Sequence, residues 1–421
     1  MGINGIHLNA ILMRKILFLL ALLPLSVHAQ ELNGPWKGKL VAGLQTLTVV
    51  LHIDQDAKTV SLDVLEQGAD NLPMEVKWLS ADSIHAVIKA ANISYSGKLV
   101  DGKLKGTFWQ GMGFQLDFEP GEVAFNRPQE PQPPFPYTTE EVTFVNSAAN
   151  VTLAGTLTYP VGYKKKKCPV VLMVTGSGAQ NRDEELFKHK PFLLLADWLA
   201  RHGIASLRYD DRGTAASTGV FADATTADFA EDARAGIQYL RSLKKFRQVG
   251  IMGHSEGGAI AFMLGSEGVL DFIVSLAGPA GRIDTMMVHQ LNLVGRSQGM
   301  TTDMVKTTEA TRNYLKKSSG GKWMDYFLDM DLTPYVQKTL CPVLALGAEN
   351  DLNVPPMFNT PALESNLPKN KHNLIKVYPG LSHLFQHNPT GSLTLSFGIE
   401  ETIAPEVLND ISNWILSVTK R

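Results

Sequence analysis

The first part of the chain alternates apolar and polar residues with a period of two. The alternation is clearest over residues 60–64 and 84–88, and turn-forming residues such as Asp101 and Gly102 separate the alternating runs. A period of two is the repeat of a strand that buries one face. We therefore expect a small antiparallel all-β domain over residues 30–125.

The start of this β domain carries a weak further signal. The segment Gly34 to Gly38, with Trp36 at its centre, loosely resembles the Trp-containing first strand of lipocalin-like barrels. That resemblance leaves open a module that binds glycan or another ligand. We favour a domain with a packing role, because a likeness of fold does not locate a binding site.

From Thr139 to the C-terminus the pattern changes to apolar runs that alternate with helical periodicity. Prolines crowd residues 126–138, which favours an extended linker between two domains. Residues 139–421 then predict a mostly parallel sheet flanked by helices. The predicted strands cover residues 142–145, 153–159, 170–175, 204–209, 249–253, 272–277, 343–347 and 374–378, and the last helix begins at Pro405.

One interval is too long for an ordinary crossover between two of these strands. Residues 279–340 contain a helical stripe of their own, which runs from Ile283 to Val294. Long segments inside a compact domain usually have a function. We expect a helical cap, inserted above the sheet.

The N-terminus has the pattern of a targeting segment. Arg14 and Lys15 precede the apolar run Ile16 to Leu23, and small residues lead to Ala29. The run is shorter than the roughly 20 residues that span a bilayer, so residues 1–29 predict a secretory signal peptide, with an upstream start-site extension before Met13. The mature protein is then expected to be exported, to the periplasm or the medium, without a membrane span.

The composition bears on whether the protein binds nucleic acid and on whether its cysteines form a disulfide. The 39 basic and 41 acidic side chains give a net charge of -2. Proteins that bind nucleic acid usually carry an excess of basic residues, so this charge gives no reason to expect nucleic-acid binding. The two cysteines, Cys168 and Cys341, each precede a predicted strand. Two other strands lie between these two in the predicted sheet, which puts the cysteines roughly 14 Å apart at about 4.8 Å per strand. Because a disulfide needs Cα atoms within about 7 Å, we predict two free, buried and unreactive thiols. The sequence gives no oligomeric state.

The strongest chemical signal is Gly253-His254-Ser255-Glu256-Gly257. It matches G-x-S-x-G, and a predicted strand precedes it while a helix-forming segment follows. In that setting the serine occupies a strained turn, where flanking side chains would collide, so glycines are required. Ser255 is therefore the candidate nucleophile.

A serine hydroxyl needs a base to take its proton and a carboxylate to orient that base. The chain order serine, acid, histidine selects Asp351, after the strand 343–347, and His383, after the strand 374–378. Their rivals are Glu349, His372 and His387. A zinc site at His383 and His387 lacks the acidic or cysteine partner that zinc motifs contain.

The negative charge of the tetrahedral intermediate needs two fixed N–H donors. The first is the amide of Glu256, directly after the nucleophile. The second is expected in the glycine-rich loop Gly176 to Ala179, where Ser177 is the favoured donor. This loop lacks the lysine of a phosphate-binding P-loop.

These motifs together carry a family resemblance over Thr139 to the C-terminus. Residues 175–183, the Tyr209 to Gly213 segment, the elbow at Ser255, Asp351 and His383 are similar to those of bacterial α/β-hydrolases of the esterase and serine-aminopeptidase-like group. The resemblance implies an α/β-hydrolase fold and ester hydrolysis through an acyl-enzyme. Thr175 stands where many relatives have a histidine, which affects only the choice of oxyanion donor. A structural ion network is expected from Arg182, Asp183, Arg208, Asp210 and Arg212.

The working hypothesis is an exported serine carboxylesterase that acts on small-molecule esters without a cofactor or a metal. One alternative is a serine peptidase or acyl-aminoacyl hydrolase, because the same triad cleaves amides. The other is a glycan-binding protein whose hydrolase domain is degenerate. The acyl and alcohol groups of the substrate depend on the cap and stay open.

Overall fold

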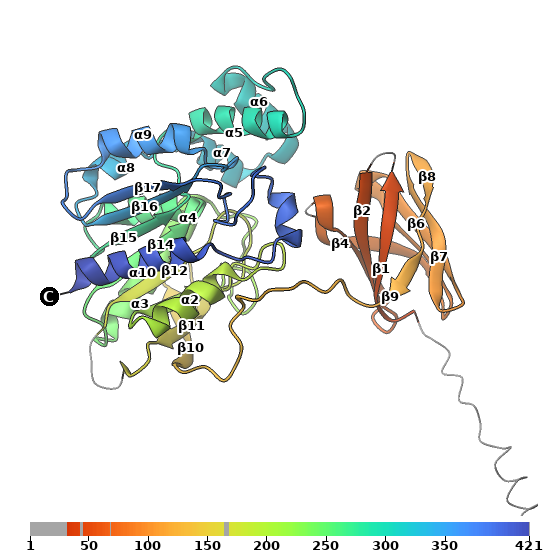
Figure 1. Ribbon diagram of the computed structural model, residues 1–421, viewed down its shortest axis with the longest axis horizontal. Helices are drawn as coiled ribbons and strands as arrows, with labels where there is room; N and C mark the ends of the chain where they lie inside the picture. Colours follow the sequence, from red (N-terminus) through yellow and green to blue (C-terminus); the bar gives the residue numbers. More distant parts are fainter. Residues whose placement is uncertain (1–31, 43–44, 68, 164–167, 421) are drawn as a thin grey trace, which may run out of the picture. The chain divides into compact units, whose positions relative to one another are not determined.

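The computed structural model describes residues 32–42, 45–67, 69–163 and 168–420 (Figure 1). The signal peptide predicted for residues 1–29 lies outside these ranges. The described chain forms two compact units, with the division between Val123 and Ala124.

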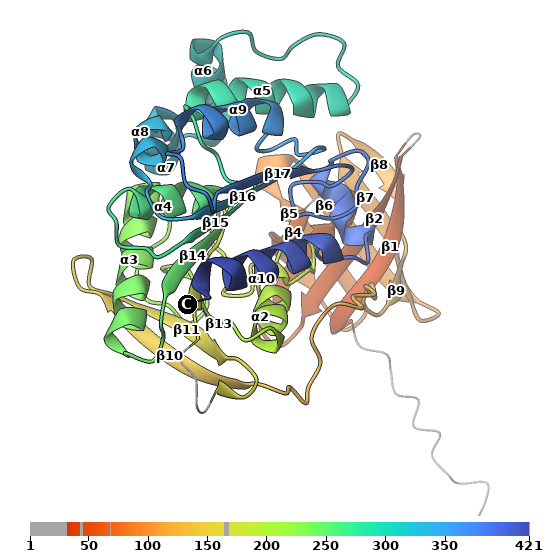
Figure 2. The ribbon, with the colours of Figure 1, turned by 60° about the vertical axis from the view of Figure 1, so that its left-hand side comes forward.

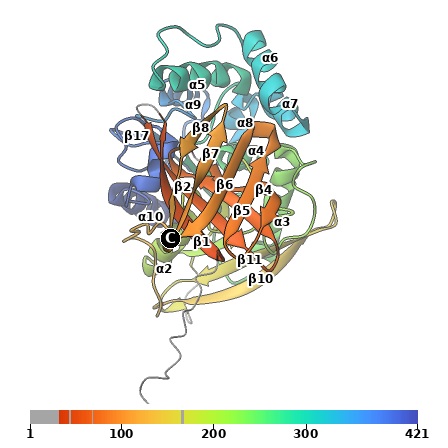
Figure 3. The ribbon, with the colours of Figure 1, turned by 90° about the vertical axis from the view of Figure 1, so that its right-hand side faces the viewer.

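The first unit is a closed antiparallel β-barrel, seen strand by strand in Figure 3. Closure follows from pairing: β7 pairs with β6 on one side and, through β9, with β1 on the other. The strands are β1 (Gly34–Ala42), β2 (Gln45–Asp54), β3 (Thr59–Val64), β4 (Ala69–Leu79), β5 (Ser83–Ile88), β6 (Ile93–Val100), β7 (Lys103–Gln110), β8 (Met112–Gln115) and β9 (Phe118–Pro120). The predicted all-β domain is thus a barrel.

Large side chains fill the interior of this barrel. Trp36, Tyr95 and Phe118 are almost completely buried, and the rings of Tyr95 and Phe118 meet edge to face at 5.0 Å. The buried hydroxyl of Tyr95 donates to the carbonyls of Leu104 and Leu116, at 3.3 and 3.2 Å. The interior of the barrel is thus filled by side chains.

The second unit contains an eight-stranded sheet in the order β10-β11-β13-β12-β14-β15-β16-β17. The first two pairings are antiparallel, and all pairings from β13 to β17 are parallel. The strands are β10 (Thr138–Asn146), β11 (Val151–Tyr159), β12 (Val170–Val174), β13 (Ala205–Tyr209), β14 (Val249–His254), β15 (Ile273–Leu276), β16 (Val343–Ala348) and β17 (Leu374–Tyr378). Every predicted strand is present, within a few residues of its expected ends.

Helices cover both faces of this sheet (Figures 1 and 2). On one face, α2 (Pro191–Arg201) and α10 (Pro405–Thr419) pack side by side, with Leu199 and Ile415 in their shared core. On the other face lie α3 (Thr226–Ser242) and α4 (Glu256–Gly265). The central strands read as continuous apolar runs because both of their faces are buried.

The interval between β15 and β16 is helical, as predicted. It contains α5 (Ile283–Ser297), α6 (Thr308–Ser319), α7 (Lys322–Asp329) and α8 (Thr333–Lys338). The first three form the cap: α5 and α6 lie at the top of Figures 1 and 2, and α7 contacts both of them. In contrast, α8 contacts α4 and buries Val336 in the core over the sheet. After β16, Pro356 opens a further helix that the sequence pattern did not predict, α9 (Pro356–Asn366), and proline suits the first turn of a helix.

The two cysteines are free, as predicted, and two strands separate β12 from β16. Cys168 is buried, but the prediction of burial was wrong for Cys341, which is half-buried. Desolvation raises the pKa of the Cys168 thiol to about 11 and that of Cys341 to about 12, so neither thiol is activated. Within the described ranges, no helix combines the length and apolar character needed to cross a bilayer.

The proline-rich segment before β10 is anchored on the second unit through Arg127. Its guanidinium donates to the carbonyls of Phe187 and Lys188, at 3.2 and 3.0 Å, and to those of Phe397 and Ile399, at 2.8 and 2.9 Å. Phe187 and Lys188 both have positive φ, 53° and 59°, a conformation that side chains rarely adopt. Arg127 therefore holds a strained turn and a second segment together.

We expect Arg127→Ala to lower the free energy of unfolding by at least about 2 kcal/mol, because it removes several hydrogen bonds from a charged donor. Arg127→Lys should recover only part of this loss, since an ammonium lacks the planar fork of a guanidinium. Urea denaturation measures both. Arg296→Ala, which breaks an exposed ion pair with Asp303, is the control, and an equal effect of Arg127→Ala and Arg296→Ala would contradict the anchor.

Candidate active site

Ser255 lies at a sharp turn between β14 and α4. Its backbone has φ 52° and ψ −118°, a strained conformation for a residue with a side chain. The turn closes only because its neighbours lack side chains: a Cβ on Gly253 would lie 1.9 Å from the carbonyl oxygen of Gly257, and one on Gly257 would lie 2.2 Å from that of Val174. The local sequence therefore dictates where the Ser255 hydroxyl is displayed.

Asp351 and His383 meet at the same edge of the sheet, after β16 and β17. The Nδ1 of His383 lies 2.8 Å from Oδ2 of Asp351, and both residues are buried. The other carboxylate oxygen accepts the backbone N–H groups of Asn353 and Val354, each at 2.8 Å. With Asp351 accepting from Nδ1–H, Nε2 of His383 is the nitrogen left to receive a proton.

The three rivals lie elsewhere. Glu349 is exposed and accepts the amide N–H of Gly380 at 2.9 Å. His372 is exposed, and His387 pairs with Glu401 at 2.8 Å. Among the described residues, no group of histidine, cysteine and acidic side chains could hold a metal ion.

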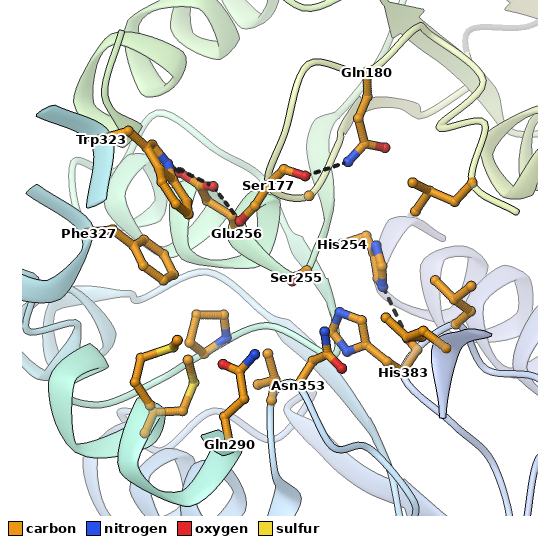
Figure 4. A pocket seen from close by; sticks show the side chains of 18 of the residues that line it. Ser177, Gln180, His254, Ser255, Glu256, Gln290, Trp323, Phe327, Asn353 and His383 are labelled. Atoms are coloured by element: carbon orange, nitrogen blue, oxygen red, sulfur yellow. Dashed lines mark hydrogen bonds between the residues drawn. The ribbon is translucent and has the colours of Figure 1, made fainter. Parts of the chain in front are cut away.

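Ser255 and His383 line one pocket of about 360 Å³, drawn in Figure 4. Ser177 and Glu256 line it as well, and so does the cap. Its apolar wall consists of Leu186, Phe187, Pro279, Met286, Met287, Trp323, Met324, Phe327, Val354, Leu384 and Leu393. Gln180, Gln290 and Asn353 add uncharged polar groups to this wall.

The residues of the two expected oxyanion donors, Ser177 and Glu256, both line the pocket. Glu256 is the first residue of α4, so its amide N–H has no acceptor within the helix. In the loop after β12, the amide of Gly176 donates to Glu184 at 3.0 Å, which occupies it. The amide of the pocket-lining Ser177, the donor expected from the sequence, is the next along the chain.

Three buried carboxylates hold this loop, and the sequence pattern did not reveal that arrangement. Glu184 accepts from Gly176, Glu256 accepts the Ser177 hydroxyl at 2.7 Å, and Asp211 accepts both the Thr175 hydroxyl at 2.9 Å and the Gln180 amide at 3.0 Å. A glycine-rich loop is thereby fixed from several sides. The clue available in the sequence was the run of acids in the motifs around 183–185 and 210–211.

His254 contacts His383 through its ring and through a hydrogen bond. Its Nδ1 lies 2.9 Å from Oε1 of Glu184, its Nε2 lies 3.1 Å from the backbone oxygen of His383, and the two imidazole rings are 4.7 Å apart. Burial opposes the charged form, but the charge and hydrogen bond of Glu184, the backbone oxygen of His383 and the charge of Asp351 together outweigh it and raise the pKa of His254. An acceptor at each ring nitrogen suits the doubly protonated ring, so these contacts give His254 a structural role.

The expected ion network is present. Arg182 pairs with Asp210 at 2.7 Å and also with Glu141, and Arg208 pairs with Asp183. Arg212 pairs with Asp232 at 2.6 Å. The residues of this network do not line the pocket.

Comparison with known proteins agrees with this geometry. The family model described as serine aminopeptidase, S33 matches residues 190–390, just under half of the chain. Esterase EstD of Thermotoga maritima is 24% identical over 273 residues, 63% of this chain and 65% of that protein. The chain thus matches slightly less than two thirds of this relative's length.

The solved structures that match this chain have lower sequence identity to it. Est1E from Butyrivibrio proteoclasticus with ferulic acid bound is 17% identical and covers 66% of this chain and 100% of its own, with a TM-score of 0.46. The Pyrococcus furiosus esterase Pf2001 is 15% identical over 70% of this chain and 98% of its own, with a TM-score of 0.45.

The sheet order, the elbow at Ser255 and the family match define the second unit as an α/β-hydrolase domain. Within that class, the domain is similar to the esterase and serine-aminopeptidase-like group. The predicted fold class is confirmed: an α/β-hydrolase domain with a helical cap, preceded by an all-β domain.

The raised pKa of Asp211 predicts how the free energy of unfolding depends on pH. Burial raises its pKa to about 8, and the charges of Glu184 and Glu256 add to this against the hydrogen bonds from Gln180 and Thr175. The folded protein then keeps a proton that the unfolded chain loses near pH 4, so Asp211 makes the free energy of unfolding fall as pH rises from about 4 to about 8.

Asp211→Asn cannot release that proton, and we expect its stability to decline less steeply over this range. Urea denaturation at a series of pH values measures the slope. The exposed Asp223, changed to Asn, is the control. An Asp211→Asn slope equal to that of the unmodified protein would refute the assignment.

Proposed function

We propose that this chain is a serine carboxylesterase that hydrolyses esters of uncharged, apolar acyl groups through an acyl-enzyme. The observation that carries the proposal is the placement of Ser255, on its strained turn, in one pocket with His383, whose Nδ1 is held by Asp351. These residue types, brought together in one pocket, support the roles of nucleophile, base and orienting acid.

In the proposed reaction the Ser255 hydroxyl attacks the ester carbonyl and its proton passes to Nε2 of His383. Asp351 stabilises the imidazolium through Nδ1–H. The negative oxygen of the tetrahedral intermediate accepts the amide N–H groups of Ser177 and Glu256. His383 then protonates the leaving alcohol, and water, activated by the same histidine, hydrolyses the acyl-enzyme.

The lining of the pocket supports an uncharged acyl group. Its side chains are mainly apolar, and Glu256 contributes the one carboxylate among the described residues that line it. That carboxylate already accepts hydrogen bonds from Ser177, Thr226 and Trp323. An aminopeptidase must bind the α-ammonium group of its substrate, and a desolvated ammonium needs an available anionic partner. The lining therefore favours an ester over an aminoacyl amide.

The volume of about 360 Å³ is at the small end of ligand pockets and suits a short or medium acyl chain or an aromatic ring. Est1E, which this chain resembles in fold, was solved with ferulic acid. An aromatic acyl group is thus one member of the class that we propose.

The triad is tested by two substitutions. Ser255→Ala should abolish turnover of p-nitrophenyl acetate, and Asp351→Asn should lower kcat by about 10⁴-fold, because the histidine is then held in the wrong tautomer. Glu349→Gln, in the exposed rival acid, is the matched control and should retain activity. Unchanged turnover by Ser255→Ala would rule out the proposal.

The substrate class is tested by a panel of p-nitrophenyl esters from acetate to octanoate beside aminoacyl p-nitroanilides. We expect kcat/KM to be highest for an uncharged acyl group of intermediate length and to be at least about 100-fold lower for the anilides, since burying an unpaired ammonium is costly. Faster cleavage of the anilides would instead establish a peptidase.

A further inference from the structure

The side chain of Glu256 connects three separate elements around the pocket. It is 2% exposed. Its two oxygens accept the hydroxyl of Ser177 at 2.7 Å, the hydroxyl of Thr226 at 2.6 Å and the indole N–H of Trp323 at 3.0 and 3.2 Å. These donors come from the loop after β12, from the start of α3 and from α7 of the cap, and Figure 4 shows Ser177 and Trp323 converging on Glu256.

Two of these partners belong to parts of the site with distinct tasks. Ser177 carries one of the amides assigned to the oxyanion, and Glu256 itself carries the other. Trp323 lines the pocket and stacks on Phe327, with ring centroids 5.1 Å apart. A single carboxylate is therefore bonded both to the oxyanion loop and to the wall of the cap.

We propose that the carboxylate of Glu256 is a positioning group that couples the seating of Trp323 in the cap to the placement of the Ser177 amide in the oxyanion hole. The inference rests on the proposed esterase function and deepens it. An acyl group that packs against Trp323 then contributes to kcat as well as to binding, because its contact energy is used where charge develops in the transition state.

The chemistry of the three donors explains why a carboxylate is suited to this position. Burial raises the pKa of Glu256, and the hydrogen bonds from Thr226, Ser177 and Trp323 oppose that shift because they stabilise the ionised form. In that form the carboxylate only accepts hydrogen bonds, so it satisfies two hydroxyls and an indole at once. The hydroxyls of Ser177 and Thr226 can rotate and accept instead, but the indole of Trp323 can only donate. In Glu256→Gln the amide oxygen must therefore face Trp323, its NH₂ group faces Ser177, and the bond to Ser177 is reversed without a change in side-chain volume.

The test is a double-mutant cycle with p-nitrophenyl butyrate. Ser177→Ala keeps the backbone amide and removes the hydroxyl, and Trp323→Phe keeps an aromatic wall and removes the indole N–H. We expect each to lower kcat by about 10-fold, less than the loss of a whole oxyanion donor, with a smaller change in KM. Because both substitutions act through one carboxylate, the fold-decrease in kcat of the double variant should be clearly smaller than the product of the two single fold-decreases.

In a Glu256→Gln background, where the bond to Ser177 is reversed and the carboxylate charge is absent, the coupling should weaken, so that the effect of the double variant comes closer to the product of the two single effects. The affinity for a phenylboronic acid, whose tetrahedral adduct on Ser255 places an oxygen in the oxyanion hole, should fall in parallel with kcat. Trp198→Phe is the matched control: its indole donates to Ser412 at 3.1 Å, between α2 and α10, and its kcat should not change.

The outcomes separate this inference from the proposed function. If the unmodified enzyme shows a burst of p-nitrophenolate but the effects of Ser177→Ala and Trp323→Phe multiply fully, or alter KM alone, the coupling is wrong and the esterase stands. If the unmodified enzyme shows neither burst nor turnover, the esterase and the coupling are both wrong. A variant that fails to fold is recognised by its circular dichroism, and the conservative Glu256→Gln series then decides the question.

Discussion

The strained backbone at Ser255 is the constraint on which the rest of the site depends. A residue with φ 52° and ψ −118° persists only where its surroundings fix it. Here β15 and α4 supply that support: the amide of Ser255 donates to Leu276 in β15 at 2.9 Å, and its carbonyl accepts from Gly258 in α4 at 2.9 Å. The turn also starts α4 directly after the nucleophile, which frees the Glu256 amide. One local conformation thus presents the hydroxyl and one oxyanion donor together.

Around this turn, the same physical rule recurs: a buried carboxylate must be matched by donors. Asp351 is matched by His383 and two amides, Glu184 by His254 and Gly176, and Glu256 by three side chains. Each pairing satisfies a charge and at the same time fixes a loop that faces the pocket. The stability of the domain and the rigidity of its site therefore have a common source.

The sequence predicted the strands of the hydrolase domain and the candidate residues Ser255, Asp351 and His383, because strand order and loop position are local properties of an apolar pattern. It did not reveal the bonds made by Glu184 or by the side chain of Glu256, since their donors come from elements distant in the chain. The position of Trp323 in the pocket could not be predicted either. The cap was recognised by its length, but the face of the cap that lines the pocket is determined by packing. The start of α9 at Pro356 was missed because Val354, Pro355 and Pro356 have an extended pattern until the following helix is considered.

The central claim is that Ser255 is an activated nucleophile, and its covalent reaction with a fluorophosphonate tests this most directly. Peptide mass spectrometry of the folded, full-length protein after labelling should locate one phosphonyl group, on Ser255, and none in the Ser255→Ala protein. A folded protein that stays unlabelled, or one that is labelled equally after Ser255→Ala, would contradict the account.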